Sequence, residues 1–188
     1  MNAEIDISNT VLKTERLILR PWRQEDLDDF YEYAKVDGVG QMAGWLPHES
    51  KEKTQMILDN FINGKKTFAL ELDGKVIGSL GIETYNPEKY PDLERLQGRS
   101  IGYVLSKDYW GQGFMPEAVK AVQRHLFETA GLDFLLISHF VWNGQSRRVI
   151  QKCGFQYLQT SIYETRYGTT EDTMVYILKK EDWEHAQA

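Results

Sequence analysis

The hydrophobic positions in the first third of the chain recur at helical intervals. Leu27, Phe30 and Ala34 are separated by three, four and seven residues, which predicts an amphipathic helix over 24–34. An apolar stripe between residues 54 and 62 predicts a second helix, and Ser50 is a residue type that caps a helix start. Between these helices the glycine-rich segment VDGVGQMAGWLPH shows no periodicity, so we expect an irregular loop there.

Alternating or continuous apolar runs before and after these two helices predict seven strands. They cover residues 16–20, 67–72, 75–82, 100–105, 134–141, 155–166 and 172–178. Asp73-Gly74, between two of these runs, is a strong signal for a two-residue hairpin. Two further helices are predicted over 116–130 and 143–153, each followed by a glycine.

The predicted elements follow the order βααβββαβαββ, which is a mixed α/β arrangement. We expect a central sheet of about seven strands flanked by about four helices. A length of 188 residues suits one domain, and we assign a single domain to 1–188. Residues 1–13 precede the first periodic pattern and are expected to form a loose lead-in.

Composition and charge narrow the class of partner. Apolar residues make up 41% of the chain and charged residues 27%, as is usual for globular domains. The net charge of -6 argues against nucleic acid as the main partner. The single cysteine, Cys153, excludes an internal disulfide and suits a reducing compartment. The start of the chain lacks a signal-peptide pattern and no apolar run reaches membrane-spanning length, so we expect a cytoplasmic protein without a membrane partner.

The stretch WGQGFMPEA places Gly111 and Gly113 directly before a predicted helix. The Gly-Lys-Ser/Thr of a Walker phosphate loop is missing, and Pro116 stands where a dinucleotide-binding fingerprint has its third glycine. Two readings remain. The turn either presents backbone N–H groups to a pyrophosphate without a lysine, or it is a tight turn with no ligand.

A second stretch, VWNGQSRRVIQKCGF, begins the last predicted helix. Asn143 and Ser146 are three residues apart, so they share one face of that helix. By themselves, a capping asparagine and a polar residue of the first turn need no ligand.

The two stretches together resemble the GNAT acyltransferase superfamily, and TERLILRPWRQEDLDDFY adds to the resemblance. They are most similar to its branch of ribosomal-protein N-terminal acetyltransferases of the RimJ/RimL kind. The resemblance implies a GNAT fold and an N-acetyltransferase that moves the acetyl group of acetyl-CoA to an amine, on a small molecule or a protein N-terminus. It implies no metal, and because dimers are common among relatives, a homodimer is one expected assembly.

The resemblance also assigns site residues. The turn that would cradle the pyrophosphate comprises Trp110, Gly111, Gln112, Gly113, Phe114 and Met115. Met115 departs from the small residue of the family pattern. The preceding strand segment that would bind the pantetheine arm comprises Tyr103, Val104 and Leu105. Asn143 matches the asparagine that contacts this arm, and Ser146 matches the serine near the cofactor sulfur.

Acetyl transfer to an amine sets further requirements. An α-amine with a pKa of about 8 loses its proton at neutral pH for ~1.4 kcal/mol, whereas a lysine amine costs ~4–5 kcal/mol. We expect Ser146 to stabilise the leaving thiolate, and a free strand N–H at Val104 or Leu105 to bind the carbonyl oxygen. For the base we favour Glu164 on the penultimate strand, with Glu83 as its rival.

Other candidates have an equally good structural explanation. The cations Arg147, Arg148, Lys152 and Lys107 suit a 3′-phosphate but also an exposed basic face, and the aromatic residues Trp45, Trp142 and Tyr85 suit an acceptor pocket but also a core. We interpret His139 as structural. The alternative to an enzyme is a catalytically silent acyl-CoA-binding module that senses or regulates.

Overall fold

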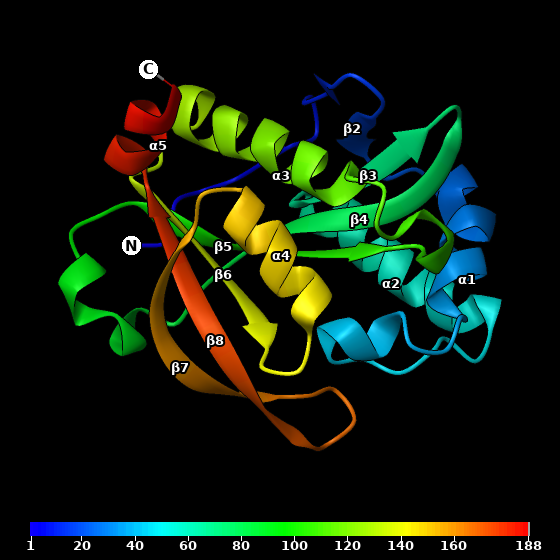
Figure 1. Cartoon of the computed structure of the whole chain (residues 1–188). Coiled ribbons are helices and arrows are strands. Elements are labelled where there is room, and N and C mark those ends of the chain that lie inside the picture. Colours follow the sequence, from blue (N-terminus) through cyan, green and yellow to red (C-terminus); the bar gives the residue numbers. More distant parts are fainter. Residues whose placement is uncertain (188) are drawn as a thin grey trace.

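The computed structural model describes residues 1–187, and its centre is one eight-stranded mixed sheet (Figure 1). The strand order is β1-β2-β3-β4-β5-β6-β8-β7. The strands are β1 (Leu12–Lys13), β2 (Ile18–Pro21), β3 (Thr67–Leu72), β4 (Lys75–Glu83), β5 (Gly98–Leu105), β6 (Phe134–Phe140), β7 (Gln156–Glu164) and β8 (Thr170–Lys179). All neighbouring strands are antiparallel except β5 and β6.

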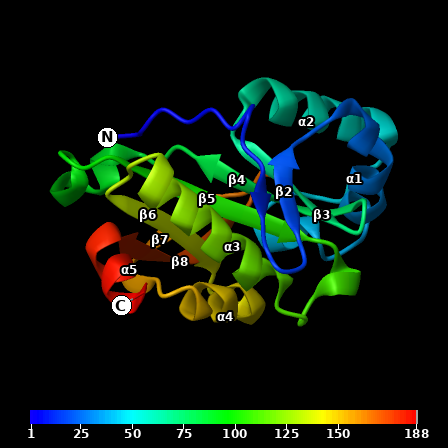
Figure 2. The ribbon, with the colours of Figure 1, turned by 90° about the horizontal axis from the view of Figure 1, so that it is seen from above.

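Five α-helices cover the two faces of this sheet (Figure 2). They are α1 (Leu27–Ala34), α2 (Lys51–Gly64), α3 (Phe114–Arg124), α4 (Gly144–Lys152) and α5 (Lys180–Gln187). On one face Phe30 of α1 and Leu58 of α2 pack in a common core with Ala69 and Val76. On the other face α3, α4 and α5 contribute to the main core, which contains Phe68, Leu70 and Ile77. Successive residues of β3 therefore enter different cores, because strand side chains alternate between faces.

The predicted single α/β domain is confirmed, with differences at its edges. The sheet has one strand more than expected, the two-residue β1, which is too short to give a sequence pattern. The missed helix α5 follows β8 without a break, and only Trp183 is buried from it. A helix that anchors by one large side chain has too little apolar periodicity to be recognised.

The lead-in 1–13 is packed more closely than we expected. Asn2 forms a bridge with Gly98, and Ala3 and Ile7 are buried. The Asn2 side chain exchanges hydrogen bonds with the backbone of Tyr85, each at 3.0 Å. These partners lie more than 80 residues away along the chain, so local sequence could not reveal them.

A buried ion pair joins the first strand to the first helix. Arg20 on β2 donates two hydrogen bonds to the Asp26 carboxylate, both at 2.8 Å, and both residues are buried. Arg20 also pairs with Glu71 on β3. The hydrogen bond to Asp26 and the charge of Glu71 raise the pKa of Arg20 above its usual value, although burial by itself would lower it. Asp26 additionally accepts the Arg23 backbone N–H at 2.8 Å.

We predict that Asp26→Asn lowers the free energy of unfolding by about 3 kcal/mol, because it leaves a buried guanidinium with only part of its counter-charge. The measurement is urea denaturation followed by circular dichroism. Asp28→Asn is the matched control, because Asp28 pairs with Lys51 at 2.7 Å on the surface and should leave the denaturation midpoint almost unchanged. Equal midpoint shifts for the two variants would contradict the importance of the buried pair.

Candidate active site

The two parallel strands at the centre of the sheet separate halfway along their length. β5 pairs with β6 from Gly98–Phe134 as far as Ile101–Ile137. Beyond that point β5 continues beside β4 and β6 continues beside β8, so a wedge opens between them (Figure 1).

The wedge exposes backbone donors of β5. The Ser106 N–H donates to the Ile77 carbonyl, on the β4 side, at 2.8 Å. Because N–H directions alternate along a strand, the Val104 N–H also points to β4, whereas the N–H groups of Tyr103 and Leu105 point into the wedge. Of the two expected oxyanion donors, Leu105 therefore has its N–H in the wedge, and Val104 does not.

The glycine turn leads into α3 earlier than predicted. Gly111 and Gly113 have φ values of 74° and 82°, the left-handed region that favours glycine, and Gly113 caps α3. The helix begins at Phe114, two residues before the predicted start at Pro116. The N–H groups of Phe114 and Met115 thus belong to the first turn, where helix donors lack partners within the helix.

Met115 does not disturb this turn. Its side chain is 4% exposed and packs in the main core, while its backbone belongs to the start of α3. The position differs from the family pattern in side-chain packing, and the backbone donors of the turn are preserved.

Arg16, before β2, holds the glycine turn in place. Its guanidinium donates to the Gln112 carbonyl at 2.9 Å and to Glu117 of α3 at 2.8 Å, and it stacks over the Phe114 ring at 4.1 Å. Burial alone raises the pKa of Glu117, but hydrogen bonds from Thr14 and Arg16 outweigh it and hold the pKa below its usual value. The start of α3 is therefore fixed by a charged contact with a segment about 100 residues away in the sequence.

The start of α4 forms the opposite wall. Asn143 accepts the Ser146 N–H at 3.1 Å and donates to the Met42 carbonyl at 3.3 Å, so it caps α4 and holds the loop before α2. Ser146 Oγ lies 2.9 Å from the hydroxyl of Tyr103 on β5. Burial raises the pKa of Tyr103 well above its usual range, although its hydrogen bond with Ser146 opposes the shift, so the phenol keeps its proton at neutral pH.

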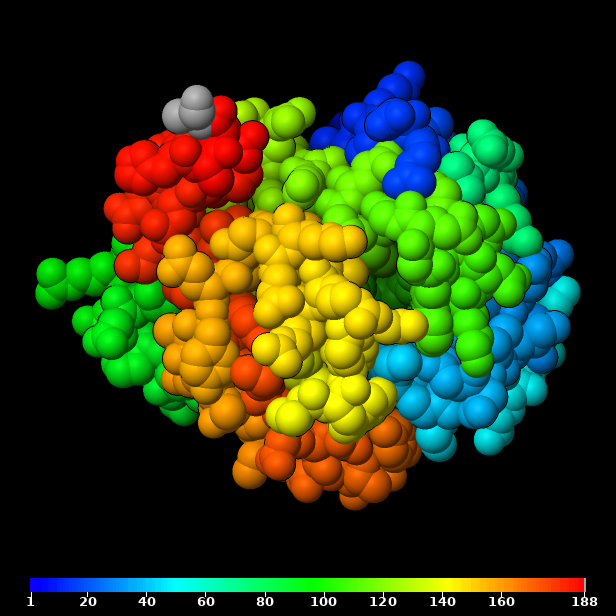
Figure 3. All heavy atoms as spheres, in the orientation of Figure 1, coloured from blue at the N-terminus to red at the C-terminus, as the bar shows by residue number. Residues whose placement is uncertain are grey.

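A cavity of about 180 Å³ lies between the glycine turn, β5 and α4. Figure 3 shows the hollow on the face where these segments meet. Ten of the eleven predicted cofactor residues line it, namely Tyr103, Val104, Leu105, Trp110, Gly111, Gly113, Phe114, Met115, Asn143 and Ser146. Gln112 does not line it, because its side chain donates to the Asp108 carbonyl at 3.0 Å.

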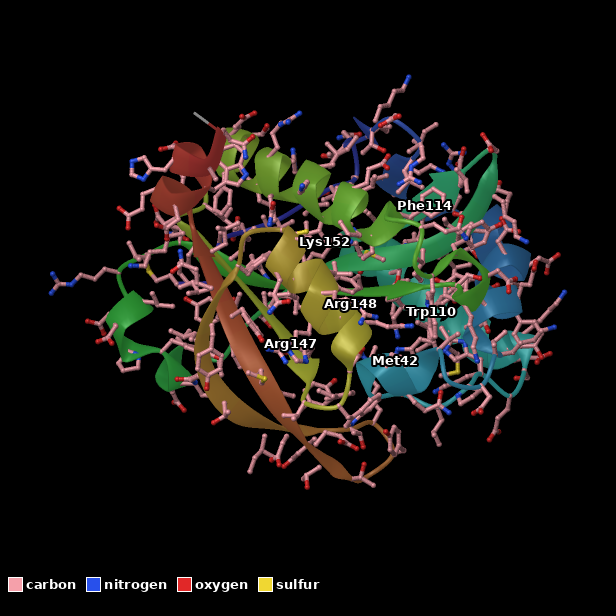
Figure 4. All side chains as sticks on the ribbon, viewed as in Figure 1. Met42, Trp110, Phe114, Arg147, Arg148 and Lys152 are labelled. Atoms are coloured by element: carbon pink, nitrogen blue, oxygen red, sulfur yellow. The ribbon has the colours of Figure 1, made fainter. Side chains whose placement is uncertain are left out.

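Two of the four candidate cations face this cavity. Arg148 and Lys152 line it, whereas Arg147 lies on the other side of α4 (Figure 4). Lys107 is placed over the ring of Trp110, 5.8 Å from its centre.

A larger cavity of about 840 Å³ continues from the first one into the wedge. The two cavities share Met42, Tyr103, Val104 and Ser146. Residues of strands β3 to β8, of helices α1, α2 and α4, of the loop before α2 and of the β7–β8 loop line it. Ser146 and Tyr103 therefore lie where a ligand of one cavity meets a ligand of the other.

The two candidate carboxylates are placed differently. Glu83, at the end of β4, lines the larger cavity, and its carboxylate folds back over Gly81. Glu164 is exposed at the end of β7 and lines neither cavity. Its neighbour Tyr163 lines the larger cavity, so strand alternation sends Glu164 to the other face. The structure does not bring Glu164 to the site.

The three candidate aromatic residues lie in different environments, and only one of them lines a cavity. Trp45 lines the larger cavity. Trp142 is exposed and donates to Glu171 at 2.9 Å, and Tyr85 is buried in a separate small core. His139 is buried, and its two ring nitrogens form hydrogen bonds with the Phe140 carbonyl and the Tyr176 hydroxyl. It also borders the larger cavity.

Among the residues of the larger cavity that sequence reasoning missed are His48 and Arg166. Both lie in irregular segments, where no periodicity indicates which side chains face inward. The only local signal for His48 is its place before Ser50, the capping residue of α2.

Two properties of the described part of the chain concern other kinds of site. Within residues 1–187, no three His, Cys, Asp or Glu side chains are grouped so that they could hold a metal ion. None of the helices in the same range has the length and apolar character needed to cross a membrane.

Several solved structures share the fold. An acetyltransferase of the GNAT family from Bacillus anthracis aligns with a TM-score of 0.78 at 22% identity, over 92% of this chain and 99% of that one. The ribosomal-protein-S5-alanine acetyltransferase from Vibrio fischeri aligns with a TM-score of 0.71 at 19% identity, over 93% and 99%. The microcin C7 self-immunity acetyltransferase MccE, solved with acetyl-CoA and AMP, gives a TM-score of 0.73 at 16% identity, over 93% and 99%.

Sequence comparison adds a relative and a family. The chain is 27% identical over 180 residues to the uncharacterized N-acetyltransferase YoaA of Bacillus subtilis, which covers 90% of this chain and 97% of the relative. The family model described as an acetyltransferase (GNAT) domain matches residues 16–156. This match spans the glycine turn, both cavities' central strands and α4, and the chain therefore belongs to the GNAT acetyltransferase family.

Proposed function

We propose that the protein transfers the acetyl group of acetyl-CoA directly to an amine, within a complex that holds both substrates. The observation that carries this proposal is the position of Ser146 and Tyr103 at the junction of two cavities. The N-acetyltransferase name of the Bacillus subtilis relative and the acetyl-CoA complex of MccE support it.

The smaller cavity has the chemistry that coenzyme A requires. Unpaired N–H groups at Phe114 and Met115, next to two left-handed glycines, suit a pyrophosphate without a lysine. Arg148 and Lys152 add positive charge beside this turn. The free edge of β5 suits the amide groups of pantetheine, which can form hydrogen bonds with it in the way that an added strand does. When bound, acetyl-CoA supplies an activated thioester.

The wedge provides the stabilisation that acyl transfer needs. The Leu105 N–H is fixed by the strand and faces the wedge, so it can donate to a carbonyl oxygen on which negative charge develops. Tyr103 keeps its proton and can donate to Ser146 Oγ, which leaves the serine hydroxyl free to donate to a leaving thiolate. Ser146 acts here as a relay, with no covalent acyl-enzyme.

We assign proton removal from the acceptor amine to Glu83, because Glu164 lies outside the cavities. Glu83 pairs with Ser100 of β5, and both residues line the larger cavity. A water relay is sufficient for an α-amine, whose deprotonation at neutral pH costs only ~1.4 kcal/mol. This modest requirement favours a protein N-terminus or a small α-amine as acceptor. The RimJ/RimL-like branch remains our proposal, supported by the fold shared with the Vibrio fischeri enzyme.

Gly113→Trp should weaken acetyl-CoA binding by about 100-fold or more, because a side chain at this turn blocks backbone donors worth ~3 kcal/mol together. Isothermal titration calorimetry with acetyl-CoA measures the change. Gly74→Trp is the control, since Gly74 has a similar φ of 83° in the β3–β4 turn with nothing within 4 Å. Unchanged affinity in a folded Gly113→Trp protein would refute the pyrophosphate assignment.

Ser146→Ala should lower kcat by about 100-fold, with little change in acetyl-CoA affinity, because only the proton relay is lost. Thiol release measures turnover, and Ser161→Ala on β7 controls for the loss of a hydroxyl outside the cavities. Wild-type turnover would remove Ser146 from the mechanism. Binding of acetyl-CoA without transfer to any amine or peptide would favour the silent acyl-CoA sensor instead.

Glu83→Gln should lower kcat/KM by about 10- to 100-fold at pH 7, and the deficit should shrink at pH 9. At the higher pH most α-amine, with a pKa of about 8, is already neutral and needs no base. Glu164→Gln is the matched control and should behave as wild type at both pH values. A deficit in Glu164→Gln together with normal Glu83→Gln activity would restore Glu164 as the base.

A further inference from the structure

The larger cavity has positively charged side chains at one end and a carboxylate at the other. Lys53, Ile57 and Phe61 line it from α2, four residues apart and hence on one helical face. A helix rises 1.5 Å per residue, so Lys53 and Phe61 lie about 12 Å apart along α2. α2 ends near Thr67, which pairs with Gly81 and borders the cavity close to Glu83. Lys53 and Glu83 therefore mark opposite ends of the cavity.

Arg166 joins Lys53 at the end away from Glu83, because the Arg166 N–H bonds to Gly44, next to Trp45, whose ring centre lies 5.0 Å from that of His48. Burial, and then the positive charges of Lys53 and Arg166, lower the pKa of His48 to about 4. Both cations thus act on the same histidine, which is only 7% exposed. His48 Nδ1 is bonded to Thr54 Oγ1 at 2.8 Å, so Nε2 is the nitrogen left to a ligand.

The turn that carries Arg166 is held rigidly against the opposite loop. The Arg166 N–H donates to the Gly44 carbonyl at 2.9 Å. Thr165 bonds to Thr169 through backbone and side chain, which closes the turn. Gly44 lies so close to Tyr163 that an added Cβ would stand 2.7 Å from its ring. The backbone that carries the exposed Arg166 side chain therefore needs no ordering when a ligand binds.

The two cations have no counter-charge of their own. In the part of the chain that the structure describes, neither Lys53 nor Arg166 forms an ion pair, although the protein carries 28 acidic residues. Glu49 borders the same end and is exposed, as both cations are, and it forms no ion pair with either of them. Like charges held close together repel, and a bound anion relieves that repulsion.

We propose that this end of the cavity binds an oxyanion, a carboxylate or a phosphate, carried by the acceptor at a distance from its amine. The proposal rests on the proposed function, because it treats the larger cavity as the acceptor site. Trp45, Phe140 and Tyr163 also line this cavity and suit an apolar or aromatic body. The acceptor class is then an amine with an anionic group, its nitrogen near Ser146 and its oxyanion at Arg166.

The first test is binding, which does not depend on catalysis. The protein, with and without saturating CoA, is titrated with phenylacetate, phenyl phosphate and the neutral phenylacetamide. We expect at least one anion to bind about tenfold more tightly than the amide, as a charge-assisted contact predicts. The anion with the larger ratio identifies the oxyanion.

Variants locate the binding to this end of the cavity. Arg166→Gln and Lys53→Gln should each reduce the anion preference, whereas Arg124→Gln, on the exposed side of α3, should not. Equal affinity for all three probes, no measurable anion binding at millimolar concentration, or a preference that survives in both cavity variants would overturn the proposal.

The second test is transfer to a matched pair of acceptors. 4-(Aminomethyl)benzoate and 4-(aminomethyl)benzamide present the same amine and ring, and only the first carries a carboxylate. We expect kcat/KM to favour the benzoate about tenfold, and Arg166→Gln to bring the ratio near one. Transfer without this preference contradicts the anion site for carboxylates. No transfer to either acceptor or to any amine or peptide of a wider panel, with acetyl-CoA and anions both bound, contradicts the proposed function and leaves the anion site standing.

Discussion

The separation of β5 from β6 beyond Ile101–Ile137 is the constraint on which the site depends. Each of these strands keeps its other neighbour, so the sheet stays continuous on both sides while its centre opens. An open strand edge leaves N–H groups without partners, which is costly unless water or a ligand satisfies them. Both cavities border this edge, and their chemistry follows from the donors that it exposes.

The walls of the wedge are fixed by contacts between distant segments. Arg16 ties the glycine turn to Glu117, and Asn143 ties α4 to the Met42 carbonyl. On the far side, the Arg166 backbone holds the loop at Gly44. Such contacts keep donors and hydroxyls in position before substrates arrive, which lowers the cost of ordering them during the reaction. The ordinary α/β scaffold thereby becomes a preorganised site.

The residues proposed for the cofactor and those proposed for the acceptor lie in different parts of the molecule. The smaller cavity, proposed for the cofactor, is built from backbone groups and short polar side chains at the starts of α3 and α4. The larger cavity, proposed for the acceptor, combines strand and helix residues with two irregular loops, the loop before α2 and the β7–β8 loop. Loops tolerate change more readily than the elements they connect, so the acceptor can differ among relatives while acetyl transfer is retained.

The sequence by itself determined the local features of this protein. Two glycines before a helix, a capping asparagine and a two-residue hairpin act through neighbouring residues, and the structure contains all three. Only the tertiary structure decided which side chains share a cavity. Tyr163 and Glu164 are adjacent, yet strand alternation places only the tyrosine in the site, and one residue of register would exchange them. Glu83, His48 and Arg166 line the same cavity through strand pairing and loop packing over long chain distances, which no local pattern encodes.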